Sequence, residues 1–145
     1  MLIFIRCGRL ATQMENGLEQ VKKGLKKKFS SRKLIFGQGF DGAKVVFVTD
    51  PATQKDFEEN KPITGHGEKT LNKLLKLAGI DKRKVYITNV VKDRPPNNRD
   101  PQPEEIALYA TFLDRQIEII KPKIIVALGR HSMKYLFEKF GLEPG

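Results

Sequence analysis

The chain has 145 residues, a length that fits one domain with a single hydrophobic core. Apolar residues make up 39% of the composition, which argues against an intrinsically disordered protein. Lys and Arg number 27 against 17 Asp and Glu, so the formal net charge is +10 at pH 7. A charge of this size indicates a polyanionic partner, with nucleic acid as the first candidate, although a lysine-rich solvated surface gives the same count.

Cys7 is the only cysteine, so the sequence offers neither an intramolecular disulfide nor a CxxC pair for a metal or a cluster. The apolar residues 2–5 are too few for a signal-peptide core or a membrane span. We therefore expect a monomeric, cytoplasmic protein that makes no contact with a membrane.

The first half of the chain predicts a helix, a strand and a second helix. Apolar residues recur at helical spacing over 18–29, and the lysines between them favour a solvated helix face over a DNA-binding arm. Residues 44–48 form a short apolar run that predicts a strand buried on both faces. Residues 49–67 contain two prolines and predict a loop, after which an apolar stripe over 71–78 predicts a helix ended by Gly79.

The second half repeats this alternation. Residues 85–91 predict a second buried strand, and the four prolines of 92–103 predict an irregular loop. A helical stripe over 106–120 ends before Pro122, and residues 124–128 predict a third buried strand. The last helix is expected to have Ser132 as its N-cap.

This order predicts an α/β fold with a parallel sheet and helices on both faces. In such sheets ligands bind beyond the carboxyl ends of the strands. The candidate site therefore lies in the loops 49–67, 92–99 and 129–131.

Two polar residues stand where strands end. Asp50 can orient a water molecule for hydrolysis, or it can form an Asx-turn with Pro51 behind it. The amide of Asn89 can read the Watson–Crick edge of one base, or it can bond to its own backbone.

Several side chains of the second and third loops are candidates for phosphate contacts, and ordinary solvated loops explain them equally well. Gly129 permits a sharp turn, and the start of the following helix offers backbone N–H groups. The candidate side chains are Lys92, Arg94, Asn98, Arg99, Arg130 and His131.

Several segments of the sequence resemble a known family. Residues 85–106 (VYITNVVKDRPPNNRDPQPEEI) and 123–132 (KIIVALGRHS) are similar to family 4 uracil-DNA glycosylases, and residues 36–48 and 61–81 match less closely. The resemblance implies a three-layer α/β/α fold with a central, mainly parallel sheet. It also implies one domain over 1–145, in which 1–35 is a divergent basic segment and 36–145 is the matching core.

The resemblance implies a base-excision repair enzyme that binds uracil-containing DNA, flips uracil out of the stack and hydrolyses its N-glycosidic bond. Asp50 matches the catalytic acidic residue, but in T-D-P-A-T where the family has G-E-A-P-G. Asn89 matches the uracil-reading asparagine, and Ile63 matches the aromatic residue that stacks on the base. Pro51 is assigned to the same pocket, and Gly65 to the DNA contacts.

The sequence also departs from the family. Two of the four cysteines that hold the family's [4Fe–4S] cluster correspond to Asp93 and Tyr109, and the other two fall within residues 21–31, so we expect no cofactor. The family's histidine, which stabilises charge on the departing uracil, is matched by neither His66 nor His131. We therefore expect weak glycosylase activity.

Two other functions stay open: a catalytically inactive DNA-binding relative, or an unrelated α/β nucleotide-binding module. The third strand is expected to be an exposed apolar edge, and residues 2–5 are a candidate for an extra strand beside it.

Overall fold

The computed structural model describes residues 14–143. The helices and strands are α1 (Met14–Lys28), β1 (Gln38–Gly39), β2 (Val45–Thr49), α2 (Gln54–Glu59), α3 (Gly65–Leu77), η1 (Lys82–Lys84), β3 (Val85–Asn89), η2 (Pro96–Asn98), α4 (Pro103–Ile120), β4 (Ile124–Leu128) and α5 (Arg130–Phe140).

The sheet has the strand order β1-β3-β2-β4. β2 pairs in parallel with β3 on one side and with β4 on the other, whereas the two-residue β1 runs antiparallel to β3. The central strands are buried on both faces, which explains why they appear in the sequence as continuous apolar runs. The prediction of a mainly parallel sheet is confirmed.

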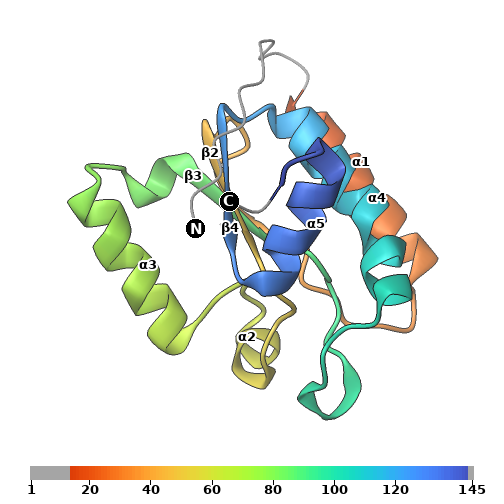
Figure 1. Ribbon diagram of the computed structural model, residues 1–145. Helices are drawn as coiled ribbons and strands as arrows, with labels where there is room; N and C mark the ends of the chain where they lie inside the picture. Colours follow the sequence, from red (N-terminus) through yellow and green to blue (C-terminus); the bar gives the residue numbers. More distant parts are fainter. Residues whose placement is uncertain (1–13, 144–145) are drawn as a thin grey trace.

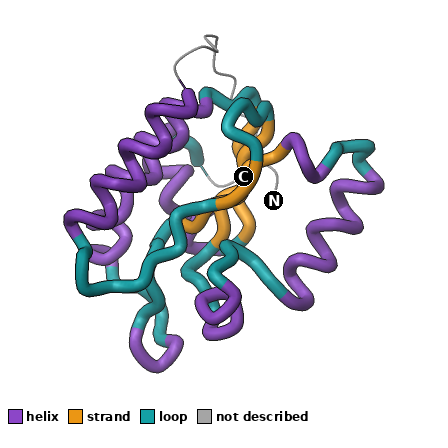
Figure 2. The backbone as a smooth tube through the Cα atoms, turned by 180° about the vertical axis from the view of Figure 1, so that it is seen from behind, coloured by secondary structure: helices purple, strands orange, loops and turns teal. Residues whose placement is uncertain are grey.

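Helices cover both faces of the sheet. α1, α4 and α5 lie on one face, and α3 lies alone on the other (Figures 1 and 2). Alternate residues of β2 point to the two sides, so that Val46 and Val48 pack in the larger core with Leu113 of α4, whereas Phe47 packs with Leu71 of α3. The predicted three-layer α/β/α architecture is confirmed.

β4 is an edge strand of the sheet formed by residues 14–143, as expected. The candidate extra strand at residues 2–5 lies outside the described residues. Within the described chain, no helix combines the length and the apolar character that a bilayer crossing requires.

Two details of the sequence prediction are wrong. The predicted loop 49–67 contains α2, and α3 already begins at Gly65. The N-cap of α5 is Gly129, and Ser132 lies inside its first turn, because a residue from another loop supplies the side-chain cap. The strands and the other helices agree with the prediction to within a few residues.

Asp56 explains why α2 forms inside this loop. Its carboxylate accepts hydrogen bonds from the backbone N–H of Thr53 at 2.9 Å and from the hydroxyl of Thr64 at 2.6 Å. Thr53 and Asp56 make a reciprocal capping box at the start of α2, while Thr64 is the N-cap residue of α3. One buried carboxylate therefore ties the starts of two helices together.

We predict that Asp56→Ala lowers the free energy of unfolding by about 1–3 kcal/mol, because it leaves the buried hydroxyl of Thr64 without its acceptor and removes the cap contacts with Thr53. Urea unfolding followed by circular dichroism measures the change. Glu59→Ala, which removes an exposed carboxylate from the same helix, is the control and should cost much less. Equal losses for the two variants would contradict this role of Asp56.

Candidate functional site

Three loops meet at the carboxyl ends of the parallel strands and enclose an open cleft of about 590 Å³. They follow β2, β3 and β4, as the sequence predicted. The loop after β2 leads to α3 on one face of the sheet, whereas the loop after β4 leads into α5 on the other face. The connections from these two neighbouring strands therefore run in opposite directions, which makes this the topological switch point of the sheet. The lining residues are Asp50, Pro51, Ala52, Thr53, Gln54, Lys55, Pro95, Arg99, Asp100, Pro101, Arg130 and His131.

Asp50 lies at this switch point and connects the loop after β2 with the start of α5. Its Oδ1 accepts a hydrogen bond of 2.8 Å from the backbone N–H of Ser132, in the first turn of α5. The partial positive charge of the helix N-terminus favours a carboxylate there. Asp50 therefore acts as a side-chain cap for α5, and the Asx-turn proposed from the sequence is not what holds it.

Gly129 makes this approach possible. Its φ is +132°, a conformation that side chains rarely adopt, and a Cβ at this position would overlap the carboxylate of Asp50. The backbone of the third loop and the side chain of the first loop are thus in direct contact.

Asn89 lies beneath the first loop and is completely buried. Its Nδ2 donates to the hydroxyl of Thr49 at 2.6 Å and to the carbonyls of Asp50 and Pro62 at 2.9 and 3.0 Å. Because carbonyls only accept, these contacts fix which end of the amide faces the loop. Oδ1 is buried and has no hydrogen-bond partner among the described residues.

The other predicted pocket residues divide between the cleft and the core. Pro51 lines the cleft beside Asp50. Ile63 is half-buried and packs with the core beneath α3, and its side chain also lies against Gly67. Gly65 begins α3 with φ +60°. A Cβ added at this position would lie 3.8 Å from the ammonium of Lys55.

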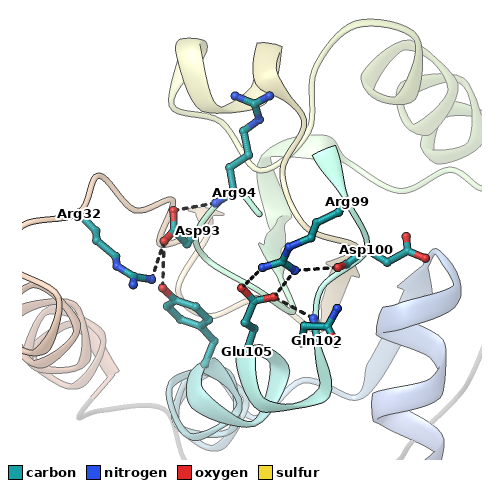
Figure 3. Close-up of polar contacts among 8 residues, drawn as sticks. Arg32, Asp93, Arg94, Arg99, Asp100, Gln102 and Glu105 are labelled. Atoms are coloured by element: carbon teal, nitrogen blue, oxygen red, sulfur yellow. Dashed lines mark hydrogen bonds and ion pairs between the residues drawn. The ribbon is translucent and has the colours of Figure 1, made fainter. Parts of the chain in front are cut away.

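The cations around the cleft have acidic partners. Both guanidinium nitrogens of Arg99 bind the carboxylate of Glu105 at 2.8 Å, and this pair lowers the pKa of Glu105 to about 2 (Figure 3). Arg130 pairs with Asp100, and Nε2 of His131 lies 3.4 Å from the same carboxylate. Hydrogen bonding to Arg130 lowers the pKa of Asp100.

Two further candidates for phosphate contacts lie in the loop after β3. The side chain of Arg94 points away from the other labelled residues, while its backbone N–H donates to the carboxylate of Asp93 at 2.7 Å (Figure 3). The side chain of Asn98 is not among those that the structure describes.

Lys92 does not lie where a phosphate can reach it, and this prediction is wrong. Its side chain is fully buried, and Nζ donates to the hydroxyl of Thr88 at 2.6 Å and to the carbonyls of Phe36 and Asn89 at 3.2 Å. Burial lowers the pKa of this ammonium to about 7. Lys92 therefore supports the end of β3 from inside the core.

A polar cluster joins the segment after α1, the loop after β3, and α4. The guanidinium of Arg32 binds the carboxylate of Asp93 at 2.9 Å, and the hydroxyl of Tyr109 donates to the same carboxylate at 3.4 Å (Figure 3). Phe29 packs against the ring of Tyr109, with the ring centroids 5.0 Å apart. Across the described residues, no group of three or more His, Cys, Asp or Glu side chains is placed to hold a metal ion.

Residues 36–143 match the family described as the uracil DNA glycosylase superfamily. The chain belongs to this superfamily. It is 48% identical over 106 residues to a type-4 uracil-DNA glycosylase of Sulfurisphaera tokodaii. These residues make up 72% of this chain and 48% of the relative. For the type-4 enzyme of Saccharolobus solfataricus the identity is 43% over 108 residues, with 74% and 50% covered.

A type-4 uracil-DNA glycosylase of Thermotoga maritima is 41% identical over 105 residues, which cover 72% of this chain and 55% of the relative. The chain spans about half the length of the curated relatives it matches. The membership assigns the fold and relates this chain to DNA repair enzymes.

The sequence did not predict the acidic residues that pair with the arginines at and around the cleft. Asp100 pairs with Arg130, and Glu105 pairs with Arg99. The hydroxyl of Thr49 accepts a hydrogen bond from the amide of Asn89. The short spacing from Arg99 to Glu105 was a usable signal for their pair. No local signal connected Asp100 with Arg130, because 30 residues separate them.

We predict that Lys92 makes the stability of the protein depend on pH. Its pKa of about 7 in the folded state lies below the ordinary value of 10.5, so between these values the unfolded chain binds more protons. The free energy of unfolding should therefore rise with pH relative to a Lys92→Met variant, by at most about 1.4 kcal/mol per pH unit.

Urea unfolding of both proteins at several pH values from 7 to 10 measures this difference. Lys44→Met, at an exposed position, should follow the wild type. A constant difference between wild type and Lys92→Met across this range would rule out the effect.

Proposed function

We propose that this protein is a uracil-DNA glycosylase that hydrolyses the bond between uracil and deoxyribose in DNA. The support comes from the type-4 relatives, whose names carry this activity, and from Asp50, which lines the cleft and accepts a hydrogen bond from the buried Asn89 through its carbonyl. We further propose that it acts as a monomer in the cytoplasm, where a chain with one cysteine fits the reducing conditions.

The observation that carries the proposal is the buried Oδ1 of Asn89, which has no hydrogen-bond partner in the described part of the chain. A buried acceptor without a donor costs about 1–3 kcal/mol, so it calls for an explanation. The N3–H group of uracil is a donor that Oδ1 can accept. Nδ2 has two hydrogens but three acceptors within reach, so it can exchange one of them for O4 of the base.

This pattern selects uracil over cytosine. Cytosine has an unprotonated N3 and an amino group at the neighbouring position, so both contacts with the asparagine would be mismatched. Asn89 accordingly reads the base. Pro51 and Ile63 are assigned to the walls of the base pocket.

Asp50 is assigned to the water. Oδ1 is occupied by the N–H of Ser132, and Oδ2 makes no hydrogen bond to the described residues, so it is the oxygen that accepts from a water molecule. In the reaction the C1′–N1 bond breaks and its electron pair leaves with uracil, while the water oxygen bonds to C1′. Asp50 takes up the proton that the water loses.

Arg94, Asn98, Arg99, Arg130, His131 and the backbone at Gly65 are assigned to the DNA backbone around the flipped nucleotide. The arginines are held in place by Glu105 and Asp100, which orients them before DNA arrives. A phosphate then has to share or replace these carboxylates, which makes binding at the cleft itself weak.

The protein is proposed to work without the iron–sulfur cluster of the type-4 family. Two positions where the resemblance expects cysteines hold Asp93 and Tyr109, and a guanidinium from Arg32 lies against them. A carboxylate, a phenol and a cation do not fit a cluster that thiolates hold. Their mutual contacts connect the segment after α1 with the loop after β3 and with α4 in the place of a cluster.

The alternative is a DNA-binding relative that has lost its chemistry. Asn89 is completely buried and its amide is engaged by the first loop, so a base reaches it only when that loop moves. A loop that never moves would leave the fold without the activity.

We predict uracil release from a single-stranded, uracil-containing oligonucleotide at low salt. Asn89→Ala should reduce the rate at least tenfold, since it removes the base-reading contacts. Asp50→Asn keeps an oxygen for Ser132 but cannot take up a proton, so it should lose at least 10²-fold in rate with little change in stability.

Gln54→Ala, which changes another residue that lines the cleft, is the control and should retain activity. No release by the wild type, together with intact binding of the oligonucleotide, would refute the enzyme and favour the inactive relative. Release that neither Asn89→Ala nor Asp50→Asn reduces would refute the assignment of these two residues.

We also predict that the purified protein takes up no cluster. After anaerobic incubation with ferrous iron and sulfide and removal of the excess, it should contain no stoichiometric iron and show no charge-transfer absorption. Retention of iron and sulfide in stoichiometric amounts would contradict this prediction.

A further inference from the structure

The positive charge of the protein lies mainly outside the cleft. Residues 22–33 contain seven Lys and Arg residues and no Asp or Glu, so this segment contributes +7 of the net charge of +10. The arginines at the cleft, in contrast, have Glu105 and Asp100 as partners. A polyanion approaching the protein therefore meets its strongest attraction beside the cleft.

We define the basic flank as the exposed cations of the last turn of α1 and of the segment that follows it. Among the side chains that the structure describes, Arg32 alone of these cations has an acidic partner, which is Asp93. The ammonium of Lys28 lies over the rings of Phe29 and Phe112. The members of the basic flank are Lys26, Lys27, Lys28, Arg32 and Lys33.

The basic flank adjoins the walls of the cleft. Arg32 contacts the loop after β3 through Asp93, and the ammonium of Lys33 lies 5.3 Å from the ring of Phe57 in α2. The chain leaving α1 runs along the same end of the molecule as α2 and the loop after β3 (Figures 1 and 2). The surface is therefore continuous from the C-terminal end of α1 to the loops.

Helix stability does not account for the whole flank. Lysines in a last turn interact favourably with the helix dipole, by about 0.3–1 kcal/mol each. Arg32 and Lys33 lie beyond the helix, however, and like charges three or four residues apart repel each other. The segment has no acidic side chain of its own, so a bound polyanion would compensate lysines that otherwise have only solvent and counterions around them.

We infer that the basic flank is a second contact surface for DNA, which holds the phosphates of the strand next to the nucleotide in the cleft. This inference rests on the proposed function, because it takes DNA as the partner. The basic flank supplies affinity independent of sequence, and the cleft supplies recognition of the base. Lysines are suited to this role because they act as mobile point charges.

The test compares two triple variants that remove the same charge. Lys26→Gln, Lys27→Gln and Lys33→Gln together neutralise the basic flank. Lys44→Gln, Lys84→Gln and Lys123→Gln together neutralise three exposed lysines that immediately precede β2, β3 and β4, respectively, at the opposite end of the sheet.

Binding of a uracil-free single-stranded oligonucleotide is measured at several salt concentrations. Each phosphate contact contributes about 0.7 to the slope of log K against log salt concentration, so the flank variant should reduce this slope by roughly 2. Lengthening the oligonucleotide should strengthen binding by the wild type but not by the flank variant. The control variant should keep both properties.

A third variant, with arginine in place of the three flank lysines, keeps the charge and should keep the slope. Equal losses in the flank and control variants would overturn the inference, because net charge alone would then explain binding. An unchanged slope in a folded flank variant would overturn it as well. Uracil release is measured separately, so a failure of the glycosylase proposal leaves the comparison of slopes valid.

Discussion

The contacts of Asp50 hold the candidate site together. Its carboxylate binds the first turn of α5, and its carbonyl accepts from the amide of Asn89 at the end of β3. One residue thus fixes the first loop to the end of β3 and to the start of α5. The cleft has its shape because this loop cannot shift without breaking contacts on both sides.

A buried polar network supports the same place from the opposite side of the sheet. Lys92 reaches the carbonyl of Asn89 and the hydroxyl of Thr88, and Gln116 of α4 donates to the carbonyl of Phe36 at 2.7 Å. A network of this kind fixes one arrangement, because any unpaired member would be costly inside the core. The end of β3 is accordingly held by the side chains of Lys92 and Gln116 and by the backbone carbonyl of Phe36.

The pattern of apolar residues was sufficient to predict the three main strands, the major helices and the layers, because burial on one or two faces imposes it directly. The α2 helix was missed because its cap depends on Asp56, whose partner Thr64 belongs to the next helix. The wrong N-cap for α5 has a similar cause, since the capping group is 82 residues away.

The candidate site was located by its three loops, and Asp50 and Asn89 do lie in contact there. What the sequence could not tell was which polar side chains are buried. Lys92 and Arg94 are two positions apart in one loop, yet of these two only Lys92 is completely buried, with its ammonium hydrogen-bonded to Phe36, Thr88 and Asn89.

The carboxylate of Asp50, which accepts the hydrogen bond from the N–H of Ser132, has two roles. As an acceptor it completes the start of α5, and in the proposed reaction the same carboxylate takes up a proton from water. A protonated Asp50 is a weaker acceptor, so the reaction step and the end of the helix are thermodynamically linked. The start of α5 should loosen transiently in each turnover, near the arginine and histidine that this helix contributes to the cleft.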